Sequence, residues 1–280
     1  MIRVMVVSDI HLSPTHGFFW DNWRIARDFV NHAAPHVVVV NGDLSINGPD
    51  SDAELAFAAS ALARLDPRVL ALPGNHDVGD EPPGQDSRQL INAERIARWK
   101  ATVGDDRFVM EAEDWLLIGL NAQLLGSGLP REEEQDHWLD RQLAAAGTRP
   151  IALFLHKPLF IDDPDEAAET VASVQPAARA RLLARLDDVG VRLVVSGHLH
   201  QHRDRELIGM RHLWAPAVAF AAARPLGGDA ACGLLALDFS ADSVEATLVR
   251  PAGLVSHDLA AIKGPYRFLR EMPPSPPPVA

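Results

Sequence analysis

Cysteine is almost absent from this sequence, since Cys232 is the single one among 280 residues. One cysteine excludes an internal disulfide framework and any metal site built from several thiolates. It also fits a reducing compartment, so we expect a cytoplasmic protein. Long apolar runs are scarce as well, because no stretch reaches the roughly 18 residues of a membrane-spanning helix. Arg3 interrupts the first apolar stretch, so the sequence predicts neither a signal peptide nor a membrane segment.

Basic residues are few compared with acidic ones. The chain carries 26 Lys and Arg against 38 Asp and Glu, which gives a formal net charge of −12. General binding of nucleic acid or of an anionic membrane needs a basic surface, so we expect neither as a partner. Histidine, in contrast, occurs 12 times, and it is the commonest metal ligand and proton carrier near neutral pH.

The first third of the chain alternates short apolar runs with amphipathic stretches, which is typical of an α/β fold. Strands are predicted at 4–7, 37–40 and 69–72, with helices over 21–32 and 51–64 between them. Two successive strand–helix–strand units predict parallel pairing with right-handed crossovers. Further along, we expect a hairpin of 108–110 with 115–120 that enters a second sheet, strands at 151–155, 191–195, 232–239 and 243–249, and helices at 89–100, 132–145 and 175–188.

Polar motifs follow five of the predicted strands, at the point where each strand ends. Because the carboxyl ends of parallel strands meet at one edge of a sheet, where ligands bind, we expect these motifs to share one site. Glycine opens three of them, which allows backbone and ligand to approach closely. The motifs are Asp9-Ile10-His11, Gly42-Asp43, Gly74-Asn75-His76-Asp77, His156 and Gly197-His198-Leu199-His200.

The spacing inside two of these motifs lets one segment supply two metal ligands. Residues two apart in an extended chain project to the same side, so Asp9 and His11 are expected to face one cavity. The same holds for His198 and His200. Imidazoles, carboxylates and one amide together form a mixed nitrogen and oxygen donor set. Such a set suits two transition-metal ions, divalent or of mixed valence (Mn, Fe, Zn, Co or Ni), rather than Ca²⁺.

These five motifs, in this order, resemble the pattern of the calcineurin-like metallophosphoesterase superfamily, and the resemblance extends from residue 4 to about residue 220. It implies a four-layer α-β-β-α sandwich with mixed sheets and the site at the strand carboxyl ends. We expect a catalytic domain over 1–264, followed by a Pro-rich tail over 265–280 that is extended or disordered.

The same resemblance implies a ligand set for each of two metal ions. One ion would be held by Asp9, His11, Asp43 and His200. The second would be held by Asp43, Asn75, His156 and His198, with Asp43 bridging the two ions.

Catalytic roles are also implied for two residues that are not metal ligands. A hydroxide between the two ions would attack phosphorus in line with the leaving oxygen. His76 would face the substrate phosphate and, as an imidazolium, would stabilise the developing charge or donate a proton to the leaving oxygen. Asp77 would orient the ring of His76, as carboxylates next to catalytic imidazoles commonly do.

The substrate is less closely specified than the metal site. The short motifs, together with His156-Lys157-Pro158 and Ala215-Pro216, look most like bacterial class III cyclic-nucleotide phosphodiesterases. That group implies hydrolysis of small phosphodiesters, including 3′,5′-cyclic nucleotides, and in many members a homodimer. A phosphomonoesterase or a nuclease with the same core is an alternative, although a nuclease would want a basic groove. A scaffold that binds without chemistry is a third interpretation.

An aromatic cluster follows the first motif and allows two interpretations. Its rings could stack on a nucleobase over the site, or they could anchor the first helix to the core. The cluster consists of Phe18, Phe19, Trp20 and Trp23.

Overall fold

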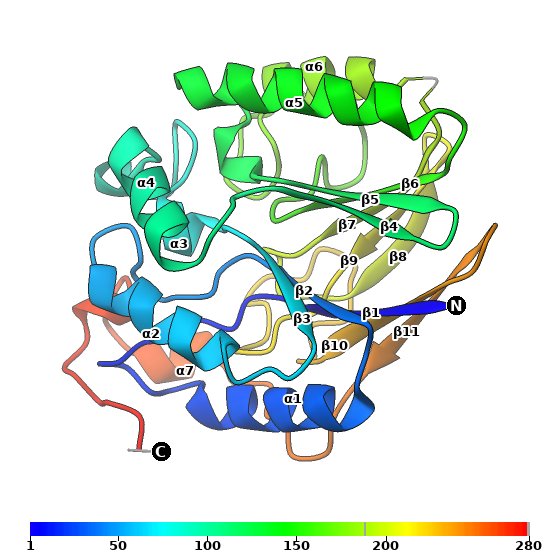
Figure 1. The fold of residues 1–280 in the computed structure, drawn as a ribbon. Coiled ribbons are helices and arrows are strands. Elements are labelled where there is room, and N and C mark those ends of the chain that lie inside the picture. Colours follow the sequence, from blue (N-terminus) through cyan, green and yellow to red (C-terminus); the bar gives the residue numbers. More distant parts are fainter. Residues whose placement is uncertain (188, 279–280) are drawn as a thin grey trace.

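The computed structural model describes residues 1–187 and 189–278, which form two mixed β-sheets (Figure 1). The first sheet contains β1 (Ile2–Val7), β2 (Val37–Asn41), β3 (Arg68–Leu72), β10 (Leu234–Phe239) and β11 (Val244–Val249). The second contains β4 (Phe108–Ala112), β5 (Trp115–Leu120), β6 (Ile151–Leu155), β7 (Val191–Ser196), β8 (Arg203–Leu207) and β9 (Met210–Trp214). The strand order is β11-β10-β1-β2-β3 in the first sheet and β4-β5-β6-β7-β9-β8 in the second.

Parallel pairing at the centre of both sheets brings several strand carboxyl ends to one edge. In the first sheet β2 pairs in parallel with β1 and β3, as predicted, with α1 (Trp20–Ala33) and α2 (Asp52–Leu62) as the crossovers. In the second sheet β6 pairs in parallel with β5 and β7. The predicted hairpin is β4–β5, and the predicted pair near the C-terminus is β10–β11, which joins the first sheet beside β1.

Three apolar layers hold the sheets and helices together. The outer face of the first sheet is covered by α1 and α2, and that of the second by α5 (Pro130–Ala146) and α6 (Pro176–Leu186) (Figure 1). Between the sheets, the side chains of Val6, Leu117 and Phe154 are fully buried in a third core. The predicted four-layer α-β-β-α sandwich is confirmed. No helix within the described ranges combines the length and apolar character that a bilayer crossing needs.

Helix boundaries differ from the sequence prediction for local reasons. The helix expected from residue 89 is α4 (Ala93–Thr102), because the Asn92 side chain accepts a hydrogen bond from the Arg95 N–H and caps the helix there. Helix α5 starts at Pro130, a residue that suits a first helical turn. Helix α6 ends at Leu186, and its predicted end at Asp188 lies outside the described residues. Short elements that the sequence pattern missed are α3 (Asn75–Val78), α7 (Leu259–Lys263), η1 (Ser87–Gln89), η2 (Ala122–Leu124) and η3 (Leu269–Glu271).

The Pro-rich C-terminal end lies against the rest of the protein. Its Ser275 N–H donates to the Thr15 carbonyl at 2.7 Å, and its carbonyl accepts from the Gly17 N–H at 2.7 Å. Leu269, earlier in the same end of the chain, is buried against Phe19. Residues 265–278 therefore cover the segment that follows the first polar motif, and positions 279–280 of the expected tail lie outside the described residues.

Candidate dinuclear metal centre

A cavity of about 720 Å³ opens at the edge where the carboxyl ends of β1, β2, β6 and β7 meet. All five polar motifs begin within three residues of a strand end, as the sequence predicted. Both sheets contribute to the cavity, so the site lies across the two halves of the sandwich. Six polar residues of the motifs line it directly: His11, Asp43, Asn75, His76, His198 and His200.

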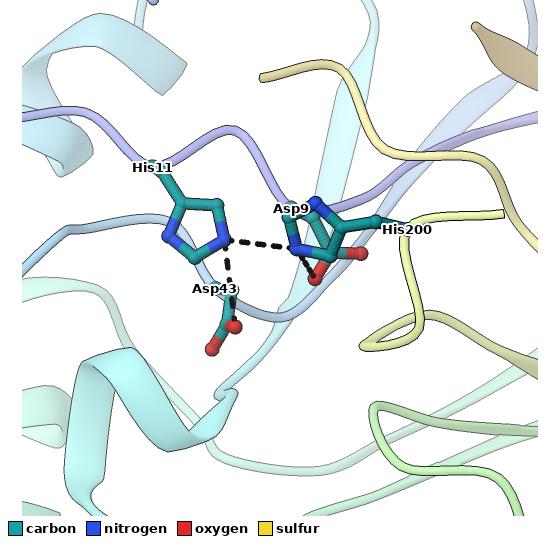
Figure 2. Close-up of side chains that lie close together, drawn as sticks. All are labelled: Asp9, His11, Asp43 and His200. Carbon is teal, nitrogen blue, oxygen red and sulfur yellow. Dashed lines mark hydrogen bonds and ion pairs between the residues drawn. The ribbon is translucent and has the colours of Figure 1, made fainter. Parts of the chain in front are cut away.

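One group of four buried side chains can hold a metal ion, and Figure 2 shows how their side chains converge. Each offers a ligand atom, and these atoms lie within 4.8 Å of one another. The two Nε2 atoms of His11 and His200 are 3.2 Å apart. Asp43 Oδ2 lies 3.6 Å from His11 Nε2, and Asp9 Oδ1 lies 3.3 Å from His200 Nε2. The group is therefore Asp9, His11, Asp43 and His200.

A second group adjoins the first through Asp43. Its other members are His156 and His198, again with ligand atoms within 4.8 Å of one another. Asp43 Oδ1 lies 3.3 Å from His156 Nε2, whereas its Oδ2 faces His11. The two oxygens of one buried carboxylate thus face different groups, which is the arrangement that a bridging ligand needs.

Within the two groups, three buried polar atoms find no hydrogen-bond partner among the described residues: Asp9 Oδ1, His11 Nδ1 and His156 Nε2. The buried Asn75 Oδ1, in the third polar motif, has none either. Leaving such atoms without a partner costs free energy, so a bound cation is the simplest way to satisfy them. The His156 ring donates from Nδ1 to the Asn41 carbonyl at 2.8 Å, and that bond turns Nε2 toward Asp43. Asp9 Oδ1 belongs to the first group and His156 Nε2 to the second, so each group holds an atom without a partner that a transition-metal ion would satisfy.

The pKa values of the buried side chains also indicate that the site favours added positive charge. Burial by itself would raise the pKa of Asp9, but the neighbouring His200 and His156 rings lower it to about 2. Burial would lower the pKa of His156, but the carboxylates of Asp43 and Asp9 raise it to about 9. Burial, together with the charges on His156 and Lys157, lowers the pKa of His198 to about 3. Buried carboxylates that stabilise a proton on a neighbouring histidine can stabilise a divalent cation in the same place.

The backbone around these ligands is strained rather than extended. Asp9 and His11 have φ angles of 55° and 44°, and His198 and His200 have 67° and 54°. The prediction that each pair projects from an extended chain is therefore wrong, although both pairs do meet at the site. Left-handed φ angles are uncommon at non-glycine residues and cost about 1–3 kcal/mol each, and such strain concentrates at functional sites. Asp43, at 53°, adopts the same conformation.

Two glycines are required by close packing around Asp43. A Cβ atom at Gly74 would lie 2.1 Å from Asp43 Oδ1, and one at Gly42 would lie 2.2 Å from His156 Nδ1. Gly42 also has a φ of 92°, which other residues rarely adopt. Both positions therefore leave room for the bridging carboxylate and its histidine neighbour, as the sequence predicted for glycine in these motifs.

His76 stands beside the first group without joining it. Its ring lies edge-on to His11, with 4.7 Å between centroids, and its Nδ1 donates to the Ile46 carbonyl at 2.9 Å. A carbonyl oxygen only accepts hydrogen bonds, so the proton in this bond belongs to Nδ1. The other ring nitrogen, Nε2, is available to form a hydrogen bond with a bound molecule. The His76 N–H donates to Asp43 Oδ1 at 2.8 Å, which ties this residue to the bridging carboxylate.

Asp77 does not orient the His76 ring, and that prediction is wrong. Its carboxylate accepts from the N–H groups of Gly74, Leu44 and Ser45, and from the Ser45 hydroxyl, at 2.8–3.1 Å. With these bonds it joins the loop that carries Asp43 to the start of α3. Burial and the charge of Asp43 raise the pKa of Asp77 to about 6. Asp77 thus fixes the backbone from which Asp43 and His76 project.

The aromatic cluster after the first motif anchors α1, and another ring takes the place beside the site. Trp20 and Trp23 are buried in the core under the first sheet, and Phe19 is buried in a small cluster with Leu269. The ring that contacts the metal-ligand candidates is Phe220, 4.0 Å from His200 and 5.1 Å from His11 between centroids. No motif marked Phe220, because it lies in irregular chain between β9 and β10.

A buried ion cluster next to His156 braces one wall of the cavity. Lys157 is fully buried, and its Nζ donates to Asp80 Oδ1 at 2.9 Å and to both Glu81 oxygens at 2.8 Å. Burial raises the pKa of Glu81 to about 7 despite the attraction of Lys157. Asp80, in the loop after α3, lines the cavity, and Lys157 follows the end of β6. The cluster therefore links this part of the cavity wall to the second sheet.

Comparison of the sequence with known proteins supplies evidence on the protein family that does not depend on the geometry of the site. The model of the calcineurin-like phosphoesterase family matches residues 2–202. The chain is 31% identical over 180 residues to the serine/threonine-protein phosphatase CPPED1 of Homo sapiens, with 60% of this chain and 54% of that protein covered. It therefore spans about half the length of this relative. To the 3′,5′-cyclic adenosine monophosphate phosphodiesterase CpdA of Escherichia coli (strain K12) it is 26% identical over 233 residues, with 77% of this chain and 76% of that protein covered.

Comparison of the fold agrees with the four-layer architecture. A dimetal phosphatase from Danio rerio superposes with a TM-score of 0.60, over 91% of this chain and 97% of that one. The two sequences are 16% identical, so this likeness concerns the fold.

Proposed function

The chain belongs to the calcineurin-like phosphoesterase family, a family of hydrolases, and on this premise we propose that it is a dinuclear metal-dependent phosphodiesterase for small substrates. The observation that carries the proposal is Asp43, a single buried carboxylate whose two oxygens face two groups of ligand atoms. We assign the first ion to Asp9, His11, Asp43 and His200, and the second to Asp43, Asn75, His156 and His198.

Three of the histidine ligands in this proposal, His156, His198 and His200, are each oriented by a hydrogen bond to a backbone carbonyl. His200 donates from Nδ1 to the Phe220 carbonyl at 3.0 Å, which leaves its Nε2 for the cavity. His198 Nε2 donates to the Val171 carbonyl at 2.7 Å, which leaves its Nδ1. Two cations bound there would lower the pKa of a water molecule and neutralise charge on the phosphoryl oxygens. Manganese, iron, zinc, cobalt and nickel all suit this donor set.

His76 is the residue we assign to proton transfer. Its Nδ1–H is held by the Ile46 carbonyl, so the ring in its imidazolium form would give the Nε2 proton to the leaving oxygen of a bound ester. The ring lines the cavity beside His11, at the place where a phosphoryl group would contact the ligand groups. Asp77 has a positioning role here, because it fixes the loop between Asp43 and His76.

Two substrate classes have support from named relatives. Resemblance to CpdA, which covers three quarters of both chains, supports a phosphodiesterase and includes 3′,5′-cyclic nucleotides among the candidates. Resemblance to CPPED1, over a shorter segment at higher identity, supports a phosphomonoesterase as the second candidate. We favour the diester because the longer match extends over more of the chain that builds the cavity. A cytoplasmic location and a homodimer stay predictions.

The experiment that tests this proposal compares three substrates on one preparation. Purified protein is stripped with EDTA, reloaded with Mn²⁺, and assayed on bis(p-nitrophenyl) phosphate, p-nitrophenyl phosphate and 3′,5′-cyclic AMP, with metal content measured in parallel. We expect metal-dependent hydrolysis with the highest kcat/KM on a diester. A clear preference for the monoester would replace the diesterase with the second candidate. No hydrolysis of any of the three by metal-loaded protein would contradict both.

A further inference from the structure

A second, smaller cavity of about 100 Å³ adjoins the candidate metal centre. Five residues line both cavities, namely His11, His76, Gln85, Phe220 and Leu259, so the two meet at the histidine that we assign to proton transfer. The outer wall of the small cavity comes from the C-terminal segment, defined here as residues 259–272. It contributes Leu259, Lys263, Arg267, Phe268, Leu269 and Arg270.

This wall is cationic, and no Asp or Glu lines the small cavity. Arg270 pairs with the Asp86 carboxylate, which also pairs with Arg88, so Arg270 is already engaged in an ion cluster. Lys263 and Arg267 donate only to backbone carbonyls: Lys263 Nζ to Arg267 O at 3.2 Å, and Arg267 Nη2 to Gln85 O at 3.3 Å. Neither forms an ion pair with a carboxylate of residues 1–187 or 189–278. Two cations without a carboxylate partner attract an anion, even in a chain with a net charge of −12.

The C-terminal segment is a fixed part of the wall. Leu269 is buried against Phe19 and Ile46, which follow the first and second polar motifs. Just beyond the segment, the backbone of Ser275 forms hydrogen bonds with Thr15 and Gly17. The Arg270–Asp86 pair adds a link to the loop that ends in η1. The backbone that carries Lys263 and Arg267 is therefore fixed at the cavity that His76 also lines.

We propose that Lys263 and Arg267 form an anion subsite, which selects phosphoesters that carry a second anionic group near the scissile phosphorus. This inference rests on the proposed function and names the substrate class of the same site. A phosphoryl group at the metal ligands would place its neighbouring carboxylate or phosphate in the small cavity, which has room for such a group. Charge-assisted hydrogen bonds from an ammonium and a guanidinium would then hold it.

The test measures binding and does not depend on turnover. Isothermal titration calorimetry on Mn²⁺-loaded protein compares 3-phosphonopropionate, which has a phosphonate and a carboxylate, with propylphosphonate, which lacks the carboxylate. We expect the first ligand to bind about 10-fold more tightly, the gain typical of a hydrogen bond between charged groups. The double variant Lys263→Gln/Arg267→Gln should lose this preference. Arg64→Gln, an exposed cation at the end of α2 that lines neither cavity, should keep it.

Two outcomes overturn the inference. Equal affinity of the wild-type protein for the two ligands would show that no second anion is recognised. An equal loss of affinity for both ligands in the double variant would mean that the cations contact the phosphoryl group itself. A different result would contradict the proposed function and leave the anion subsite standing. That result is wild-type protein that binds both phosphonates, with the preference for the first, but hydrolyses no phosphoester.

Discussion

The proton-transfer role of His76 is decided at the scale of a single residue. Its Nδ1 is committed to the Ile46 carbonyl, and its ring does not belong to either group of ligand atoms. We therefore expect His76→Ala to lower kcat by about 10²- to 10⁴-fold, the usual contribution of a general acid, while the metal content stays that of the wild type. Kinetics and inductively coupled plasma mass spectrometry on the same samples check this. His32→Ala, an exposed histidine on α1, is the matched control. Metal loss in His76→Ala would make His76 a ligand.

Asp43 carries a different prediction, because it alone belongs to both groups of ligand atoms. We expect Asp43→Asn to reduce metal content at both positions, since one neutral amide replaces a charged bridge. His200→Ala should lose one ion and keep the other, because His200 belongs only to the first group. Metal-to-protein ratios after gel filtration measure both effects, and circular dichroism verifies that the variants are folded. Two tightly bound ions in Asp43→Asn would contradict the bridging assignment.

Asp77 shows what residue types alone do not predict. The sequence Gly74-Asn75-His76-Asp77 places a carboxylate next to the proposed catalytic histidine, which suggested that Asp77 orients the His76 ring. In the structure the Asp77 side chain accepts the Gly74 N–H three residues earlier, as in the capping box of a short helix. A glycine followed three residues later by an acidic residue is itself a helix-start signal. That local signal would have predicted the observed role, because backbone N–H groups at a helix start need acceptors.

At the scale of elements, the docking of the C-terminal end depends on backbone hydrogen bonds that sequence patterns do not encode. Ser275→Pro removes the N–H that donates to the Thr15 carbonyl, which should cost about 1 kcal/mol and loosen residues 265–278. We expect faster tryptic cleavage after Arg267 and Arg270, measured by mass spectrometry over time. Ser275→Ala keeps the N–H and should be cleaved at the wild-type rate. Equal cleavage rates in all three proteins would show that this pairing does not hold the segment.

Elements with a strong local pattern were predictable, and those held by distant contacts were not. The run Val37–Val40 predicts a strand buried on both faces, and β2 is that strand. The five-residue helix α7 is too short to show a helical period, although its Leu259 and Ile262 pack, partly buried, against the cluster that contains Phe19. Lys263 of this helix lines the small cavity together with His11. Its position depends on the packing of the distant Leu269 against Phe19 and Ile46. The ligand motifs are local, whereas the wall that faces them is not.

At the scale of the whole molecule, folding stability should depend on pH through His212 on β9, which belongs to neither group of metal-ligand candidates. This side chain packs against Phe160, and its Nε2 has no hydrogen-bond partner among the described residues. Burial, and to a smaller extent the charge of Arg205, lower its pKa to about 4. Between pH 6.5 and 4 the unfolded chain therefore binds a proton that the folded protein does not, and the free energy of unfolding falls as the pH is lowered.

The size of this effect follows from the shift in pKa. From pH 7.5 to pH 4 we expect His212 to account for a loss of up to about 3 kcal/mol, since one pKa unit corresponds to about 1.4 kcal/mol. Urea unfolding of His212→Leu and of the wild type at both pH values isolates this contribution, because acid release of metal affects the two proteins alike. The variant should lose less stability on acidification than the wild type. His32→Leu should follow the wild type, and an identical pH dependence in His212→Leu would mean that other groups set the acid sensitivity of the fold.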